Sequence, residues 1–266
     1  MCAVAVAFVD FGCSLSFDTG PLPSDDGGPQ GDTGAPDHGG TPGYDSGDGN
    51  SDTGADTSAP KPQPPKFIDK STDSAESVTV LRGHKPPGAL QGDLLLASIY
   101  VKDAQNGITP PAGWTLMDQR GLTDCGTTAW AYHFCGNAEP SEYDFAIKLE
   151  RDFLRIAIVT YRGVDRVSPI GQHVVTDFVD TLFYGPVSLT TDQPNETLVM
   201  MVGNKSATGW LTPDGMNLRV NADALGVFDE PRPNAGKTDS RTATSSGSAS
   251  DSCGDVQLVG LHAAPL

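Results

Sequence analysis

The chain has few basic residues. Its 266 residues include 17 Lys and Arg against 34 Asp and Glu, and the formal net charge is −17. Nucleic-acid binding depends on Lys and Arg that replace the counterions of the phosphates, and anionic membrane surfaces attract basic segments in the same way. We therefore expect no nucleic-acid partner, and contact with a membrane only through a lipid anchor.

Long apolar runs are also missing. The apolar stretch at residues 3–9 is far shorter than the roughly 20 residues that span a bilayer, and it lacks the basic residues that begin a secretory signal. The Gly-Cys-Ser sequence at 12–14 nevertheless resembles the cleavage and lipidation site of bacterial lipoproteins. That resemblance implies that residues 1–13 are a signal remnant, that Cys13 carries a lipid, and that the protein is anchored at the surface of a bacterial envelope. The alternative is a disordered N-terminus with incidental cysteines.

Residues 14–66 have few large apolar side chains. They hold nine Asp and two Lys among many Gly, Pro and Ser, and so carry seven of the negative charges. Such a segment has too little to bury to offset the entropy of ordering its backbone. We predict a disordered acidic linker, with a stiffer Pro-rich end at residues 60–66.

Two motifs in this linker have functional alternatives. Asp-Thr-Gly occurs three times, at Asp18, Asp32 and Asp52, but an aspartic protease holds that motif between packed apolar strands. The spacing of Asp48, Asn50, Asp52 and Asp56 partly follows an EF-hand loop, without its Gly at position six or its Glu at position twelve. We expect weak calcium association at most, and otherwise no cofactor.

Helix-favouring runs are scarce after residue 66, and short Val-, Thr-, Leu- and Tyr-rich segments alternate with turn residues. This pattern predicts an all-β domain at residues 67–266, arranged as a two-sheet, antiparallel, jelly-roll-like sandwich. The expected strands cover residues 77–82, 93–101, 114–119, 127–134, 143–149, 154–161, 173–178, 186–190, 197–202, 217–227, 241–248 and 256–262.

Two of these strands show which side chains face the core. Residues 93–101 are almost continuously apolar, as in a central strand that is covered on both faces. Along residues 127–135, Trp130, Tyr132 and Phe134 fall on one face and His133 and Cys135 on the other. We expect the aromatic face to lie in the core.

Several short motifs resemble a known module. In order they are GDLLLA at 92–97, PAGWT at 111–115, AEP at 138–140 with YDF at 143–145, YRGV at 161–164, and a closing strand at 256–265. Together they resemble a β-sandwich domain of secreted bacterial proteins and phage minor tail proteins. The resemblance covers about residues 70–266, and it implies an extracellular, non-enzymatic module.

The cysteines of the domain suggest one disulfide. Cys125 and Cys253 each precede a Gly and then a strand, so both can lie at one end of the sandwich. Cys125 and Cys135 are separated by a whole strand of about 25–30 Å, whereas a disulfide requires Cα atoms within about 7 Å. We predict a Cys125–Cys253 disulfide, with Cys135 buried or unpaired.

The chain has no Cys-x-x-Cys or His-x-x-x-His spacing and no Gly-x-Ser-x-Gly turn. His84, His173 and His262 have no evident partner, and a zinc set of Cys125, His133, Cys135 and Cys253 fails on the same strand length. The pairs Glu139–Glu142 and Asp177–Asp180 suggest solvated turns. We therefore predict no metal site and no catalytic residue.

Tryptophans are the remaining candidates for ligand binding, because aromatic rings stack on sugars and peptides. Trp130 is expected in the core, Trp114 at one end of it after a Pro-Pro-Ala-Gly turn, and Trp210 in an exposed loop. We predict a non-catalytic, surface-tethered binding or adhesion protein whose partner is a polysaccharide or a surface protein. The alternatives are a carbohydrate-active hydrolase on the same fold and a structural domain of a surface or tail-like assembly.

Overall fold

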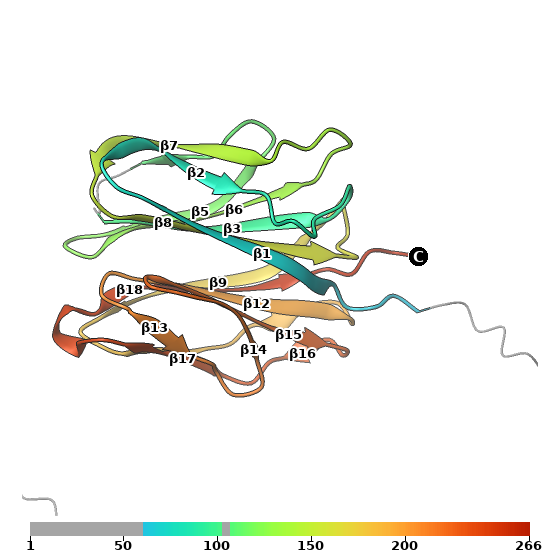
Figure 1. Ribbon diagram of the computed structural model, residues 1–266. Helices are drawn as coiled ribbons and strands as arrows, with labels where there is room; N and C mark the ends of the chain where they lie inside the picture. Colours follow the sequence, from blue (N-terminus) through green and yellow to red (C-terminus); the bar gives the residue numbers. More distant parts are fainter. Residues whose placement is uncertain (1–60, 103–106) are drawn as a thin grey trace, which may run out of the picture. The chain divides into compact units, whose positions relative to one another are not determined.

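The computed structural model describes residues 61–102 and 107–266, which form eighteen strands and one short 3-10 helix at Ala249–Asp251 (Figure 1). Cys13, the three Asp-Thr-Gly motifs and the calcium candidates lie outside these residues. The all-β, antiparallel sandwich expected from the sequence is confirmed. None of the described residues belongs to a helix of the length and apolarity needed to cross a membrane.

The first half of the described chain is a complete eight-stranded sandwich. One sheet has the order β1-β8-β3-β6-β5 and the other the order β2-β7-β4. This is the strand order of a jelly roll, in which strands 1, 8, 3 and 6 form one sheet and strands 2, 7 and 4 lie in the sheet that faces it. The strands are β1 (Lys66–Ala75), β2 (Val78–His84), β3 (Leu94–Val101), β4 (Ile108–Thr109), β5 (Thr115–Leu122), β6 (Gly126–Phe134), β7 (Glu142–Arg151) and β8 (Leu154–Arg162).

The second half repeats this topology. Its sheets have the orders β9-β18-β12-β15-β14 and β10-β17-β13, which match the first half strand for strand, with a two-residue pair β11-β16 added. The region therefore holds two sandwiches where the sequence predicted one with two sheets. The strands are β9 (Ile170–Val179), β10 (Phe183–Val187), β11 (Thr190–Thr191), β12 (Glu196–Asn204), β13 (Gly209–Leu211), β14 (Asn217–Ala222), β15 (Leu225–Arg232), β16 (Gly236–Lys237), β17 (Arg241–Ser246) and β18 (Cys253–Leu261).

The two sandwiches pack through their five-stranded sheets, so that four main layers lie one above another (Figure 1). Three apolar cores fill the spaces between these layers. Leu95 and Ile99 of β3 face the core of the first sandwich, whereas Leu96 and Tyr100 face the core between the sandwiches. All eight residues of β3 are buried, which confirms a central strand covered on both faces.

The same arrangement explains β6. Trp130 lies in the core between the sandwiches, as expected for the aromatic face, with Tyr132 and Phe134 packed against it. The opposite face is also buried, and it includes Ala131 and Cys135. Cys135 is the free cysteine of the described residues. Both faces of β6 are buried because each face packs in a different core.

The predicted disulfide is confirmed. Cys125 and Cys253 are bonded, with their Cα atoms 5.4 Å apart and a sequence separation of 128. The bond joins the β5–β6 turn of the first sandwich to the start of β18 in the second. Gly126 has φ +137°, and a Cβ there would collide with the ring of Tyr100, so this turn needs glycine beside the bridge.

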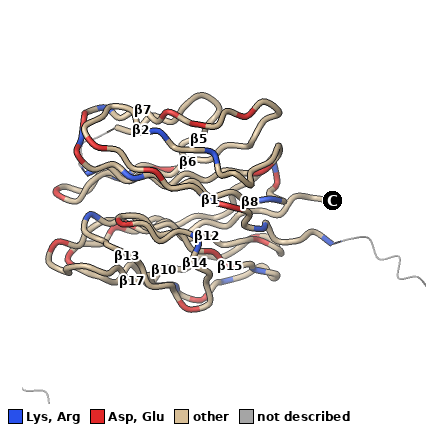
Figure 2. Tube along the Cα trace, viewed as in Figure 1, with Lys and Arg blue, Asp and Glu red and all other residues tan. Residues whose placement is uncertain are grey.

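Some strand predictions need correction. Residues 217–227 are a hairpin of β14 and β15 rather than one strand, and the turn contains Asp223 with φ 34°. Strand β1 was not expected from the sequence, because it carries four charged residues. It nevertheless pairs with β8 along its length. Polar side chains are usual on edge strands, because they discourage pairing with other chains. Acidic and basic residues occur together over the loops and outer strands (Figure 2).

Candidate functional site

A hollow of about 360 Å³ opens at one end of the first sandwich. We call it the Trp114 hollow. Its residues come from the turn before β5, the end of β6, and the loop and first residues of β7. They are Pro111, Ala112, Trp114, His133, Glu139, Pro140, Glu142, Tyr143 and Asp144.

The Pro-Pro-Ala-Gly turn places Trp114 in this hollow. The backbone N–H of Trp114 donates to the backbone carbonyl of Pro111 at 3.2 Å. Gly113 has φ +86°, a conformation that favours glycine. The indole is half-buried. It stacks on His133 with ring centroids 5.4 Å apart and meets the ring of Tyr143 edge-on at 5.0 Å. Trp114 thus caps the core, as expected, and also lines the hollow.

Glu139 is the central polar residue of the hollow, and its side chain is only 8% exposed. Its carboxylate accepts hydrogen bonds from the Tyr143 hydroxyl at 2.7 Å and from the Gly136 N–H, and it lies 3.0 Å from Nε2 of His133. The other ring nitrogen, Nδ1, lies 2.8 Å from the carbonyl oxygen of Gly113. Both ring nitrogens of His133 therefore face hydrogen-bond acceptors, which fixes the orientation of the ring.

These contacts keep Glu139 ionised. Burial alone would raise its pKa, but the Gly136 N–H, the Tyr143 hydroxyl and His133 together lower the pKa below the usual value. Burial and the hydrogen bond to Glu139 raise the pKa of Tyr143. A glycosidase requires a carboxylic acid with a raised pKa as proton donor, and Glu139 has the opposite property. It is suited to accepting hydrogen bonds from a ligand.

The outer wall of the hollow is also acidic. Glu142 and Asp144 lie on β7, with side chains 42% and 55% exposed, and both contact Arg82 of β2 at 3.2 and 2.8 Å. Glu142 is thus partly solvated, as expected, whereas Glu139 is not, and the prediction for Glu139 is wrong. Asp177 and Asp180 are exposed, as expected.

The prediction that Trp210 is exposed is wrong. Trp210 lies in β13, is 4% exposed, and packs edge-on against Tyr184 at 5.3 Å. Its indole N–H donates to the carbonyl of Asp223 at 3.2 Å. The polar residues before it suggested a loop, but the ring faces the core of the second sandwich, where it packs over β15. Trp210 is therefore a core residue of the second sandwich and offers no ring face to a ligand.

Two histidines have partners that the sequence analysis did not find. Nδ1 of His84 lies 2.7 Å from Asp73 on β1, at the surface of the first sandwich. Nε2 of His262 lies 3.0 Å from Asp192, with Glu196 close by. Asp192 and His262 are 70 positions apart, so no sequence spacing could have indicated that cluster.

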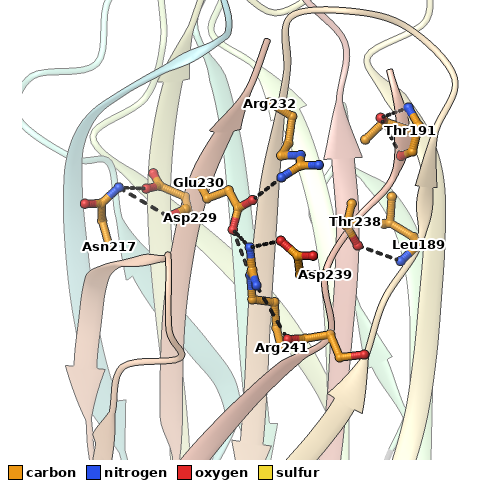
Figure 3. A network of polar contacts seen from close by, with 11 residues as sticks. Leu189, Thr191, Asn217, Asp229, Glu230, Arg232, Thr238, Asp239 and Arg241 are labelled. Atoms are coloured by element: carbon orange, nitrogen blue, oxygen red, sulfur yellow. Dashed lines mark hydrogen bonds and ion pairs between the residues drawn. The ribbon is translucent and has the colours of Figure 1, made fainter. Parts of the chain in front are cut away.

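A further polar network lies in the second sandwich (Figure 3). Glu230 on β15 accepts hydrogen bonds from Arg232 at 3.0 Å and from Nε of Arg241 at 2.8 Å. Asp229 beside it bonds Asn217 at 3.3 Å. The carboxylates of Asp229 and Glu230 are almost fully buried and face guanidinium groups, so this network holds β14, β15 and β17 together.

No protein-family model matches the chain, and no curated protein and no solved structure gives a significant match.

Proposed function

We propose that this chain is an exported, surface-tethered binding or adhesion protein that holds a neutral or basic carbohydrate in the Trp114 hollow. The observation that carries the proposal is the composition of the hollow. Trp114 and Tyr143 supply aromatic surface, and Glu139, Glu142 and Asp144 supply carboxylates around the same space.

This combination suits a sugar for two reasons. The C–H face of a sugar ring packs on aromatic rings, and its hydroxyl groups donate hydrogen bonds to carboxylates, which only accept them. The three carboxylates contact two imidazoles and one guanidinium, from His133, His84 and Arg82. These basic groups are already paired with the carboxylates, so they are poorly placed to bind an anionic polysaccharide, and the proposal is limited to neutral and amino sugars.

A binding role also fits the protonation of the hollow better than catalysis does. Glu139 is held as an ionised acceptor by three donors. The proposed lipid at Cys13 and the acidic linker would keep the sandwiches at the cell surface, with the hollow free to reach a partner. A purely structural domain would have no use for an accessible acidic hollow.

The test is a glycan array probed with the purified full chain, followed by calorimetric titration of any neutral or amino glycan that binds. Tyr143→Phe removes one donor to Glu139, and Glu139→Gln removes the central charge. We expect both to weaken binding at least about tenfold, the size of one or two lost hydrogen bonds to a charged group. Phe183→Ala removes an aromatic ring that is 60% exposed on the second sandwich, and it serves as the matched control.

Two results would overturn the proposal. One is a chain that binds no neutral or amino glycan while it remains folded. The other is binding that Phe183→Ala weakens and the hollow variants do not. Release of reducing sugar from a bound polysaccharide would instead indicate the hydrolase, and loss of that release in Glu139→Gln would place it in the hollow.

A further inference from the structure

A second cluster of polar side chains lies at one end of the second sandwich. Asp192 follows β11, Glu196 begins β12, and His262 follows β18. One donor atom of each lies within 4.8 Å of the other two. Nε2 of His262 is 3.0 Å from Oδ1 of Asp192 and 3.9 Å from Oε1 of Glu196.

The backbone fixes the imidazole of His262, which is 3% exposed. Its Nδ1 lies 2.7 Å from the carbonyl oxygen of Ser168. A carbonyl only accepts, so Nδ1 is the nitrogen that donates, and an ion placed between the ring and the two carboxylates would take the lone pair of Nε2. Histidines that bind metals are oriented in this way, with the second ring nitrogen donating to a carbonyl or carboxylate.

Glu196 adds an independent observation. The residue is fully buried. Its Oε1 accepts hydrogen bonds from the N–H groups of Asp192 and Gln193 at 3.0 and 2.9 Å, but its Oε2 has no hydrogen-bond partner. A buried carboxylate oxygen without a partner is costly. A positive ion beside it would remove that cost.

Two glycines leave space at this oxygen. A Cβ on Gly171 of β9 would lie 2.6 Å from Nε2 of His262 and 3.3 Å from Oε2 of Glu196, so both atoms face the same small volume. A Cβ on Gly260 of β18 would collide with Oε2. Larger residues at either position would fill the volume that the donor atoms share.

We propose that Asp192, Glu196 and His262 bind one divalent transition-metal ion of the Zn²⁺ type. Zinc takes imidazole nitrogen and carboxylate oxygen at about 2.0–2.2 Å, so two donors on a tetrahedral ion lie about 3.4 Å apart. The distances of 3.0 and 3.9 Å from Nε2 to the two carboxylates bracket that value. The Asp192 side chain is 50% exposed, which leaves one side of the site open for a water ligand.

The ion would join two segments that are distant in the chain. It would hold the end of β18 against the connection between β11 and β12, and it would stabilise the fold because the unfolded chain lacks the assembled site. The competing account is a protonated His262 that pairs with Asp192 and needs no metal. The two accounts differ in whether the folded chain takes up an ion at this place.

The test uses the full chain, stripped with a chelator and titrated with Zn²⁺ alone by calorimetry, with thermal unfolding measured in parallel. Asp192→Asn alters the exposed ligand and is expected to fold, and His262→Asn removes the imidazole. His84→Asn is the matched control, because His84 also lies near two carboxylates, Asp73 and Glu142, but at the surface. The acidic linker and the thiols outside the sandwiches are the same in every variant.

We expect wild type and His84→Asn to bind one more Zn²⁺ per chain than His262→Asn, and to unfold at a higher temperature when the ion is present. Asp192→Asn should bind this ion at least about tenfold more weakly, since even changes around the ligands of a site cost 10–100-fold. Identical isotherms for wild type and Asp192→Asn, with both folded, would overturn the proposal in favour of the protonated pair.

Discussion

The bond between Cys125 and Cys253 should contribute a large part of the stability of the two sandwiches. It closes a loop across 128 sequence positions, for which the chain-entropy relation gives about 5 kcal/mol at 25 °C. Unfolding roughly 200 residues carries an entropy of about 0.4 kcal/mol per kelvin. Opening the bridge should therefore lower Tm by roughly 12 °C.

The assay is calorimetric unfolding with and without reductant. The Tm of the wild type should fall by roughly 12 °C on reduction. The double variant Cys125→Ala/Cys253→Ala should have the lower Tm from the start, and reductant should not change it. Cys135→Ala removes a buried sulfur without opening a bridge, so it should keep the full response. The reasoning is refuted if thiol counting shows the bridge fully reduced while Tm of the wild type stays unchanged.

Three further predictions follow from single buried side chains. Burial raises the pKa of Asp255 well above its usual value, so its contribution to stability is present at acidic pH and is lost as pH rises above about 4. Asp255→Asn should remove that loss when the free energy of unfolding in urea is measured between pH 4 and 7. An unchanged dependence of that free energy on pH would contradict the prediction. Burial raises the pKa of Cys135 to about 11, so a thiol reagent at pH 8 should label it only after denaturation, and rapid labelling of folded protein would contradict its burial. Trp210→Ala should lower the free energy of unfolding by about 3–5 kcal/mol. A loss under about 1 kcal/mol would contradict the burial of Trp210 and support the exposed position expected from the sequence.

The strands of the fold could be predicted because their cause is local. The uninterrupted apolar run of β3 required cover on both faces, and that cover is present. The duplication was not recognised from the sequence, and it is evident from the strand order that the two halves share. One signal did exist: the central parts of β8 and β12 are apolar on both faces, as in β3. Four stacked layers explain why these strands are covered on both sides.

The candidate sites were harder to predict because they depend on which side chains meet in the folded chain. Trp114 could be identified from its rigid turn, but the acceptor role of Glu139 depends on His133 and Tyr143 across two strands. Trp210 was misplaced because its neighbours are polar, while its burial depends on Tyr184 in another strand. Local composition indicates turns and cores, and it carries little information about which side chains meet.

The most direct test of the proposed binding function uses the indole N–H signals of the three tryptophans in a ¹⁵N–¹H spectrum of the full chain. Trp130 and Trp210 are buried, and Trp114 lines the hollow. A neutral or amino glycan that binds as proposed should shift the Trp114 signal and leave the other two in place. Saturable glycan binding that shifts the Trp210 signal, or none of the three, would contradict the assignment of the site to the Trp114 hollow.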